Sequence, residues 1–234
     1  EIPYSVDELC EATVEIIKKN NIKSCYIRPL AYYGYGQMGV DPTGAPVDVI
    51  IAVWPWDAYL GEEALQNGIK VGVSSWRQRS FNAIPPAVKS SASYMNSILA
   101  KKEATLHGYA EAIMLNEEGR VCEGTGENIF VVRNGILSTP PLSDGLLEGI
   151  TRDTILTLAT DMDIPAIEES LTRSDLYIAD EAFMTGSAAE LTPINSIDDR
   201  VIGKRGPITE QLQKRYFDVA YGKVPEYEDW ITRF

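Results

Sequence analysis

The stretch that decides the fold is residues 89–135, KSSASYMNSILAKKEATLHGYAEAIMLNEEGRVCEGTGENIFVVRNG. Its first part has a pattern that predicts a helix from about Ser91 to His107. Three short strand-like segments follow, at residues 111–115, 120–123 and 128–133, and the sequences Glu-Glu-Gly and Arg-Asn-Gly supply typical hairpin turns. A helix followed by hairpin-connected strands predicts a mixed α+β domain.

Downstream of this stretch, helical and strand-like patterns alternate as far as a final helix near residues 209–221. Just upstream, residues 69–76 have the composition of a strand, and Pro85 and Pro86 interrupt the chain before Lys89. No internal repeat is present. We therefore expect one large domain over residues 65–234.

The N-terminal part has a different organisation. An amphipathic helix is expected over residues 5–20, where Ser5 is the N-cap and Glu8 completes a capping box. Strand-like runs at residues 23–33 and 47–54 are separated by the loop sequence GYGQMGVDPTGAP, and Pro55 ends the second run. We therefore expect a small domain over residues 1–54 and a hinge over residues 55–64.

Composition excludes several classes of protein. The formal net charge of -13 leaves no basic surface to neutralise a nucleic acid backbone. Cys10, Cys25 and Cys122 lie far apart and His107 is the one histidine, which argues against a disulfide framework or a metal site. His107 is expected at a helix end in a structural role. No apolar run is long enough for a membrane span and the first residues do not resemble a signal peptide, so we expect a cytoplasmic protein.

Lys89 stands out chemically. It follows Pro85, Pro86, Ala87 and Val88 and precedes small residues, and such surroundings can remove water from an amine, lower its pKa and make it a nucleophile. Taken alone, a solvated surface lysine is the more common case. The sequence GYGQMG matches a dinucleotide-binding GxGxxG motif only loosely, because it leads into a loop and not into a helix.

Three segments carry a resemblance to a known family: residues 89–135, TPPLSDGLLEGITRDTILTLA at 139–159, and LYIADEAFMTGSAAELTPI at 176–194. Together with YIRPLAYYGYGQMGVDP and DVIIAVWPWDAYLGEEAL, they resemble the branched-chain amino acid aminotransferases. The resemblance implies a two-domain fold type IV pyridoxal 5'-phosphate enzyme, like D-amino acid aminotransferase. It also implies that the small domain lacks its N-terminal part, which in relatives includes an arginine on the cofactor phosphate.

The resemblance assigns the cofactor site by position. Lys89 matches the lysine that holds pyridoxal phosphate covalently, Tyr94 the tyrosine on its phenolic oxygen, and Glu123 the carboxylate that keeps its pyridine nitrogen protonated. The phosphate-binding residues would be Gly149, Ile150 and Thr151 at a helix N-terminus and Gly186 and Ser187 in a turn. The alternatives are a core tyrosine, a solvated turn glutamate and an ordinary threonine cap.

The resemblance also implies a substrate site. Tyr26 and Arg28, two residues apart on one strand, would receive a substrate carboxylate together with the amides of Ser187 and Ala188. The matching apolar wall consists of Tyr33, Met38, Val40, Trp56 and Tyr59. An exposed strand arginine and ordinary core packing of the wall residues are the alternatives.

The expected activity is transfer of the amino group of L-leucine, L-isoleucine or L-valine to 2-oxoglutarate. A D-amino acid aminotransferase or an aminodeoxychorismate lyase has the same fold and is the first alternative. An inactive fragment or cofactor-binding remnant is the second. Small amino and 2-oxo acids are the expected ligands, and relatives imply a homodimer or a larger homo-oligomer.

Overall fold

The computed structural model describes residues 1–56 and 59–234, and the chain divides into two compact units. One unit comprises Glu1–Asp57 with Arg233–Phe234, and the other comprises Ala58–Thr232. The hinge expected at residues 55–64 includes Asp57 and Ala58, which lie outside the described residues. The domain boundaries therefore stay a prediction.

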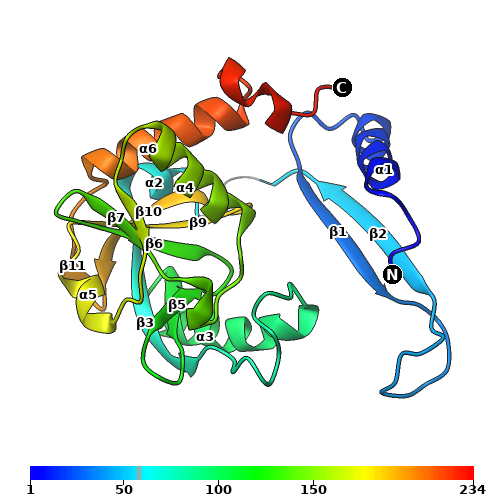
Figure 1. Cartoon of the computed structure of the whole chain (residues 1–234), viewed down its shortest axis with the longest axis horizontal. Helices are drawn as coiled ribbons and strands as arrows, with labels where there is room; N and C mark the ends of the chain where they lie inside the picture. Colours follow the sequence, from blue (N-terminus) through cyan, green and yellow to red (C-terminus); the bar gives the residue numbers. More distant parts are fainter. Residues whose placement is uncertain (57–58) are drawn as a thin grey trace. The chain divides into compact units, whose positions relative to one another are not determined.

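The first unit consists of one helix and a two-stranded sheet (Figure 1, blue). Helix α1 (Val6–Lys19) begins after Ser5, which forms the expected capping box with Glu8. Strands β1 (Tyr26–Tyr33) and β2 (Val47–Trp54) pair antiparallel, with Tyr26 opposite Trp54 and Tyr33 opposite Val47. The connecting residues 34–46 are irregular, as predicted.

The second unit contains the remaining secondary structure (Figure 1). Its helices are α2 (Glu62–Asn67), α3 (Tyr94–Leu106), α4 (Ile150–Asp161), α5 (Arg173–Tyr177) and α6 (Pro207–Ala220). Its strands are β3 (Ile69–Arg77), β4 (Glu111–Leu115), β5 (Val121–Gly124), β6 (Asn128–Arg133), β7 (Ile136–Thr139), β8 (Ala166–Glu168), β9 (Glu181–Gly186), β10 (Glu190–Ile197) and β11 (Arg200–Val201). Short 3-10 turns occupy Ser91–Ser93, Leu142–Asp144 and Pro225–Trp230.

The described strands of this unit form one mixed sheet of nine strands in the order β5-β4-β3-β10-β9-β6-β7-β8, with β11 paired to β10. Hairpins join β4 to β5, β6 to β7 and β9 to β10. The β6–β7 turn uses Asn134 and Gly135, both at positive φ, as its sequence predicts. Strand β3 pairs parallel to both neighbours, β4 and β10, so residues 69–77 lie beside residues 190–197.

The core is divided between the two sides of this sheet. Helices α4 and α6 cover one side (Figure 1), where Leu158 and Leu212 pack on Phe130 and Phe183, whose rings stack with centroids 5.0 Å apart. A second cluster includes Ile113 and other residues of β3, β4, β6, β9 and β10, packed against α5. Burial of each such apolar side chain stabilises the folded state by about 1.5–3 kcal/mol. The sheet is therefore a rigid base for the residues at its strand ends.

Most of the expected elements are present, and the differences are at their ends. The first strand begins at Tyr26 and not at residue 23, because the chain bends at Lys23 and Ser24. The helix expected from Ser91 begins as a 3-10 turn and becomes α-helical at Tyr94. Helix α6 begins two residues before Thr209, because Pro207 suits the first helical position.

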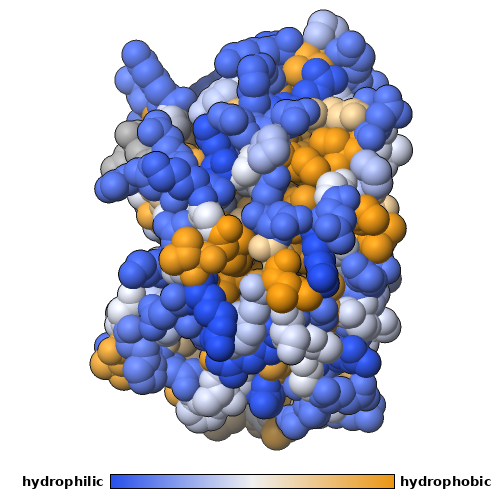
Figure 2. Space-filling model, turned by 90° about the vertical axis from the view of Figure 1, so that its left-hand side faces the viewer, coloured by the Kyte–Doolittle hydropathy of each residue, from blue (hydrophilic) through white to orange (hydrophobic). Residues whose placement is uncertain are grey.

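The face shown in Figure 2 is mainly hydrophilic. Figure 2 shows one face on which hydrophobic residues form separate clusters among hydrophilic ones. Among the described residues, no helix has both the length and the apolar composition required to cross a membrane.

Candidate active site

Lys89 lies on an irregular segment between β3 and α3, and its Nζ atom is 5.7 Å from the centre of the Tyr94 ring. The structure therefore brings this predicted pair together. Tyr94 is the first residue of α3 and only partly buried, so the alternative of a core tyrosine is wrong. The segment lies at the surface, and Val88 and Lys89 are exposed, which agrees with a solvated lysine and not with an amine shielded from water by its neighbours.

The side-chain carboxylate of Glu123 accepts hydrogen bonds from three donors. Its Oε2 accepts hydrogen bonds from the Leu147 amide at 3.1 Å and from Asn128 Nδ2 at 3.5 Å, and its Oε1 accepts one from Gln78 Nε2. Burial raises the pKa of Glu123 to about 7, although the Leu147 amide, Arg79 and Lys89 oppose this shift. The alternative of a solvated turn glutamate is therefore wrong.

Two members of this network were not identified from the sequence. Gln78 is 1% exposed and immediately follows β3, and no sequence pattern marks such a residue as different from any polar residue at a strand end. Asn128 lies within CEGTGEN and accompanies Glu123 in the sequence motif. Its Nδ2 also donates to the Leu147 carbonyl at 2.9 Å, so Asn128 links Glu123 to the segment before α4.

The N-terminus of α4 has the properties of an anion site. Gly149 is the N-cap and provides no side-chain cap, and the Thr151 hydroxyl makes no hydrogen bond within the described part of the chain. Thr151 is 6% exposed and is not the helix cap, so the threonine-cap alternative is wrong. A Cβ atom at Gly149 would lie 2.0 Å from Asn128 Oδ1, so any larger residue at this position would force the Asn128 side chain to move. The unused amides of this helix end can receive a phosphate.

The second predicted phosphate turn lies beside the first. Strand β9 ends at Gly186, and pairing of β6 with β9 places Thr185 opposite Asn128. The Thr185 hydroxyl is buried with no hydrogen-bond partner in the described structure. A Cβ atom at Gly186 would lie 3.3 Å from the Gly126 carbonyl oxygen. The structure thus gathers Glu123, Gly149 and Gly186 around Asn128.

Tyr26 and Arg28 form a cluster within the first unit. Arg28 Nη2 donates to the Tyr26 hydroxyl at 2.8 Å, and the Tyr26 ring contacts the rings of Trp54 and Trp56 at 5.1 and 4.6 Å. Strand alternation therefore places both side chains on one face, as predicted. Arg28 is exposed, which also agrees with the alternative of a strand arginine.

The expected apolar wall is not part of a core. Tyr33, Met38, Val40, Trp56 and Tyr59 all have exposed side chains, so the core-packing alternative is wrong for this set. Tyr59 belongs to the second unit, where the Lys101 Nζ atom lies 5.5 Å from its ring centre. Their role as a substrate wall stays a prediction.

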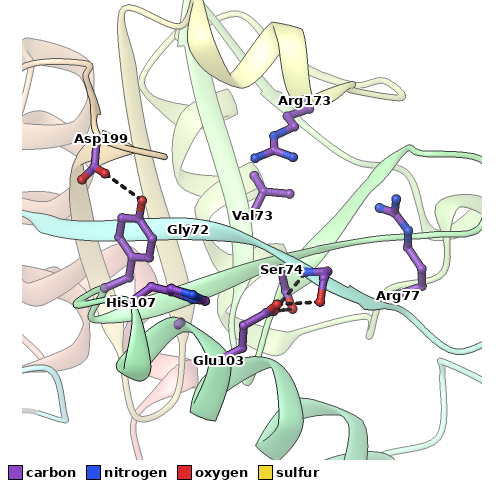
Figure 3. Close-up of a pocket in the computed structure, with 11 residues that line it drawn as sticks. Gly72, Val73, Ser74, Arg77, Glu103, His107, Arg173 and Asp199 are labelled. Atoms are coloured by element: carbon purple, nitrogen blue, oxygen red, sulfur yellow. Dashed lines mark hydrogen bonds between the residues drawn. The ribbon is translucent and has the colours of Figure 1, made fainter.

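A separate cleft of about 570 Å³ opens beside β3 and contains none of the predicted cofactor or substrate residues (Figure 3). Glu103 of α3 accepts hydrogen bonds from Ser74 and Ser75, and the Tyr109 hydroxyl donates to Asp199 at 3.0 Å. Burial raises the pKa of Glu103, but the two serines and nearby His107 lower it below its ordinary value. His107 lies at the end of α3, as predicted.

A known protein family matches most of the chain. The family model described as amino-transferase class IV matches residues 1–197. The branched-chain-amino-acid aminotransferase of Pseudomonas aeruginosa is 50% identical over 234 residues, which are 99% of this chain and 76% of that protein. The Escherichia coli K12 enzyme of the same name is 46% identical over 235 residues, which are also 99% of this chain and 76% of that protein.

Solved structures give the same result. The branched-chain aminotransferase of Thermoproteus uzoniensis with norvaline matches with a TM-score of 0.95 and 47% identity, over 99% of this chain and 77% of the other. The branched-chain amino acid aminotransferase of Thermobaculum terrenum in its PLP form matches with a TM-score of 0.92 and 39% identity, over 98% of this chain and 75% of the other. The expected α+β fold of type IV is confirmed, and the chain belongs to the class IV aminotransferase family.

Proposed function

We propose that this chain is a pyridoxal phosphate-dependent aminotransferase that acts on L-leucine, L-isoleucine or L-valine and on 2-oxoglutarate. The observation that carries the proposal is the enclosed Glu123 carboxylate, which shares the Asn128 network with the uncapped end of α4. The choice of branched-chain substrates is supported by relatives of that name at 46–50% identity.

The described residues fit the cofactor. A protonated pyridine nitrogen is stabilised by a carboxylate, which Glu123 supplies, and a phosphate is bound by free donors, which the start of α4 and the unpartnered Thr185 hydroxyl supply. Gly149 and Gly186 allow close backbone approach. Lys89 would hold the cofactor covalently, Tyr94 would donate to its phenolic oxygen, and Gly149, Ile150, Thr151, Gly186 and Ser187 would hold its phosphate.

When bound, pyridoxal phosphate serves as the electron sink for the bond broken at the substrate Cα. In our proposal Lys89 Nζ holds and moves the proton at that carbon, and Glu123 keeps the positive charge on the ring nitrogen. Tyr26, Arg28 and the amides of Ser187 and Ala188 bind the substrate carboxylate. The apolar side chains of Tyr33, Met38, Val40, Trp56 and Tyr59 select a branched side chain.

The test is the visible absorption spectrum of the protein with pyridoxal phosphate, before and after addition of L-leucine. We expect a band that bleaches with L-leucine, and borohydride reduction should place the cofactor mass on the Lys89 peptide. Lys89→Ala should abolish both the reduction product and turnover, whereas Lys102→Ala, an exposed lysine on α3, should change neither. A Lys89→Ala protein with full turnover would overturn the proposal.

The same preparation distinguishes the alternatives. Turnover of D-alanine in preference to L-leucine would identify a D-amino acid aminotransferase, and release of pyruvate without an amino acceptor would identify a lyase. A protein that binds pyridoxal phosphate but converts no amino acid would be a cofactor-binding remnant. Light scattering tests the proposed homodimer or larger homo-oligomer.

A further inference from the structure

Three carboxyl groups lie close together where β4, β5 and β6 meet. Glu111 begins β4, Glu123 lies near the end of β5, and Glu127 immediately precedes β6. Glu111 is 0% exposed and Glu127 is 4% exposed. Such burial of neighbouring acids is costly unless each charge is paired or one acid keeps its proton.

Glu111 has the contacts of an ionised carboxylate. Its Oε2 is 2.6 Å from Lys101 Nζ, and its Oε1 accepts hydrogen bonds from the Thr125 hydroxyl at 2.6 Å and the Ala112 amide at 2.7 Å. Lys101 Nζ also donates to the Ala110 carbonyl at 2.6 Å. Within the described structure, Lys101 is the one cation that forms an ion pair with this cluster, and Glu111 holds it.

Glu127 has a different set of contacts. Within the described residues, its carboxyl group accepts one hydrogen bond, from the Gly126 amide at 3.0 Å, and forms no ion pair. Burial, and then the charge of Glu111, raise the pKa of Glu127 to about 8, while the Gly126 amide and Lys101 oppose this shift. Glu123 raises it further, and Tyr59 is the other titratable group that faces Glu127.

The Glu127 side chain also fills the space behind the turn that follows Glu123. The Gly124 amide donates to the Glu127 carbonyl at 2.6 Å, and a Cβ atom at Gly124 would lie 2.8 Å from Glu127 Oε2. On the other side, a Cβ atom at Gly186 would lie 3.7 Å from Glu127 Cα and Cγ. Glu127 thus separates the Glu123 turn from the Gly186 turn.

We propose that Glu127 is a positioning residue that works as an uncharged carboxylic acid beside ionised Glu111. In this state it fills the space between the Gly124 and Gly186 turns without repelling Glu111 or Glu123. Loss of its proton at alkaline pH places a third negative charge in the cluster and loosens both turns. The part of this inference that concerns cofactor binding rests on the proposed function, whereas the protonation state of Glu127 does not.

The protonation state can be tested on the full chain without added cofactor. Between about pH 4.5, the ordinary value, and pH 8, folded Glu127 holds a proton that the unfolded chain has lost, so the stability contribution of this group falls as pH rises. The melting temperature of the wild type should therefore decline relative to Glu127→Gln from about pH 5 to pH 8. The Gln variant keeps the shape and hydrogen-bond donor of the neutral acid.

Infrared spectroscopy at neutral pH gives a second readout. The band of protonated carboxylic acid groups should lose intensity in Glu127→Gln. In Glu111→Gln the pH at which the Glu127 contribution disappears should fall, because removal of the Glu111 charge takes away one of the causes that raise the pKa of Glu127. Glu117→Gln, in the exposed β4–β5 turn, should leave the band unchanged. An unchanged band in Glu127→Gln, together with a pH dependence of melting identical to the wild type, would overturn the proposal.

Affinity for pyridoxal phosphate tests the positioning role. Glu127→Gln should bind the cofactor as the wild type does at pH 7 and more tightly than the wild type above pH 8. Glu127→Ala should bind it about tenfold more weakly at every pH, the effect of about one lost hydrogen bond. Equal affinity in the Ala and Gln variants would overturn the positioning role even if the enzyme proves to be an active aminotransferase. Conversely, a protonated Glu127 in a chain with no aminotransferase activity would leave this inference standing and refute the proposed function.

Discussion

The amide of Leu147 donates a 3.1 Å hydrogen bond to Oε2 of Glu123 and so connects the end of β5 to the segment that leads into α4. Asn128 strengthens this connection, because it donates both to Glu123 and to the Leu147 carbonyl. The carboxylate proposed for the ring nitrogen and the helix end proposed for the phosphate are therefore positioned by one network. Substitutions in that network should therefore affect binding of both the cofactor ring and the cofactor phosphate.

Glu123→Gln should lower affinity for pyridoxal phosphate by about 10- to 100-fold, because the loss of a hydrogen-bonded charge pair costs about 1.5–3 kcal/mol. Turnover should fall with it, since the ring nitrogen loses its negative partner. Affinity can be measured by fluorescence titration. Glu118→Gln, an exposed glutamate in the β4–β5 turn, is the control. Wild-type affinity in Glu123→Gln would contradict the role of this carboxylate.

Gly149→Ala should weaken cofactor binding without unfolding the chain. The new Cβ atom would lie 2.0 Å from Asn128 Oδ1, so Asn128 must move and release Leu147 and Glu123. We expect a loss of affinity of about tenfold, from one or two disturbed hydrogen bonds. Thr160→Ala, at the exposed far end of α4, should have no such effect. Equal affinities in the two variants would exclude the proposed coupling.

Arg28→Lys should raise the KM for 2-oxoglutarate about tenfold or more, while kcat changes little. A lysine cannot reproduce the planar fork that binds a carboxylate through two hydrogen bonds. Tyr26→Phe, which removes the hydroxyl that accepts from Arg28, should have a smaller effect of the same kind. Steady-state kinetics with both substrates checks this prediction. A fall in kcat at constant KM would assign Arg28 to the chemical step instead.

Asp198→Asn should destabilise the fold in a pH-dependent way. Burial raises the pKa of Asp198, but hydrogen bonds from Tyr177, the Val73 amide and Arg173 outweigh burial and lower it below its ordinary value. The stabilising effect is therefore complete above about pH 4 and is lost as pH falls through the folded pKa.

We expect the free energy of unfolding of Asp198→Asn to be about 1.5–3 kcal/mol lower than that of the wild type at pH 7, measured by urea unfolding. The difference between the two proteins should become smaller as the pH is lowered. Asp229→Asn, at an exposed position, is the matched control and should show neither effect. A difference between Asp198→Asn and the wild type that stays constant down to pH 3 would contradict the assignment.

Local sequence signals predicted the elements well where one signal dominates. Ser5 and Glu8 specify the start of α1, and the Asn134-Gly135 pair specifies the β6–β7 turn. The order of strands in the sheet could not be predicted in this way. Pairing of β3 with β10 depends on packing between residues more than a hundred positions apart, which no local pattern encodes.

The candidate site likewise has residues that the sequence identified and residues that only the folded structure brings into view. Lys89, Tyr94 and Glu123 were identified by resemblance, and the helix end at Gly149 also follows from sequence. Gln78 and the Glu111–Glu127 pair were not, because their importance arises only when strands β3 to β6 bring them beside Glu123. The sequence also left open whether Lys89 is exposed, since apolar neighbours in sequence do not ensure burial in space.

The pairing of β3 with both β4 and β10 also affects how the chain folds while it is synthesised on the ribosome. Strand β3 can pair with β4 once both have emerged, but its other edge pairs with β10, whose residues 190–197 are translated much later. Until then the nascent chain presents an open, largely apolar strand edge on which other chains can add. Slow translation or crowding of nascent chains should therefore promote aggregation at this edge, and early engagement of a chaperone with residues 69–77 should reduce it.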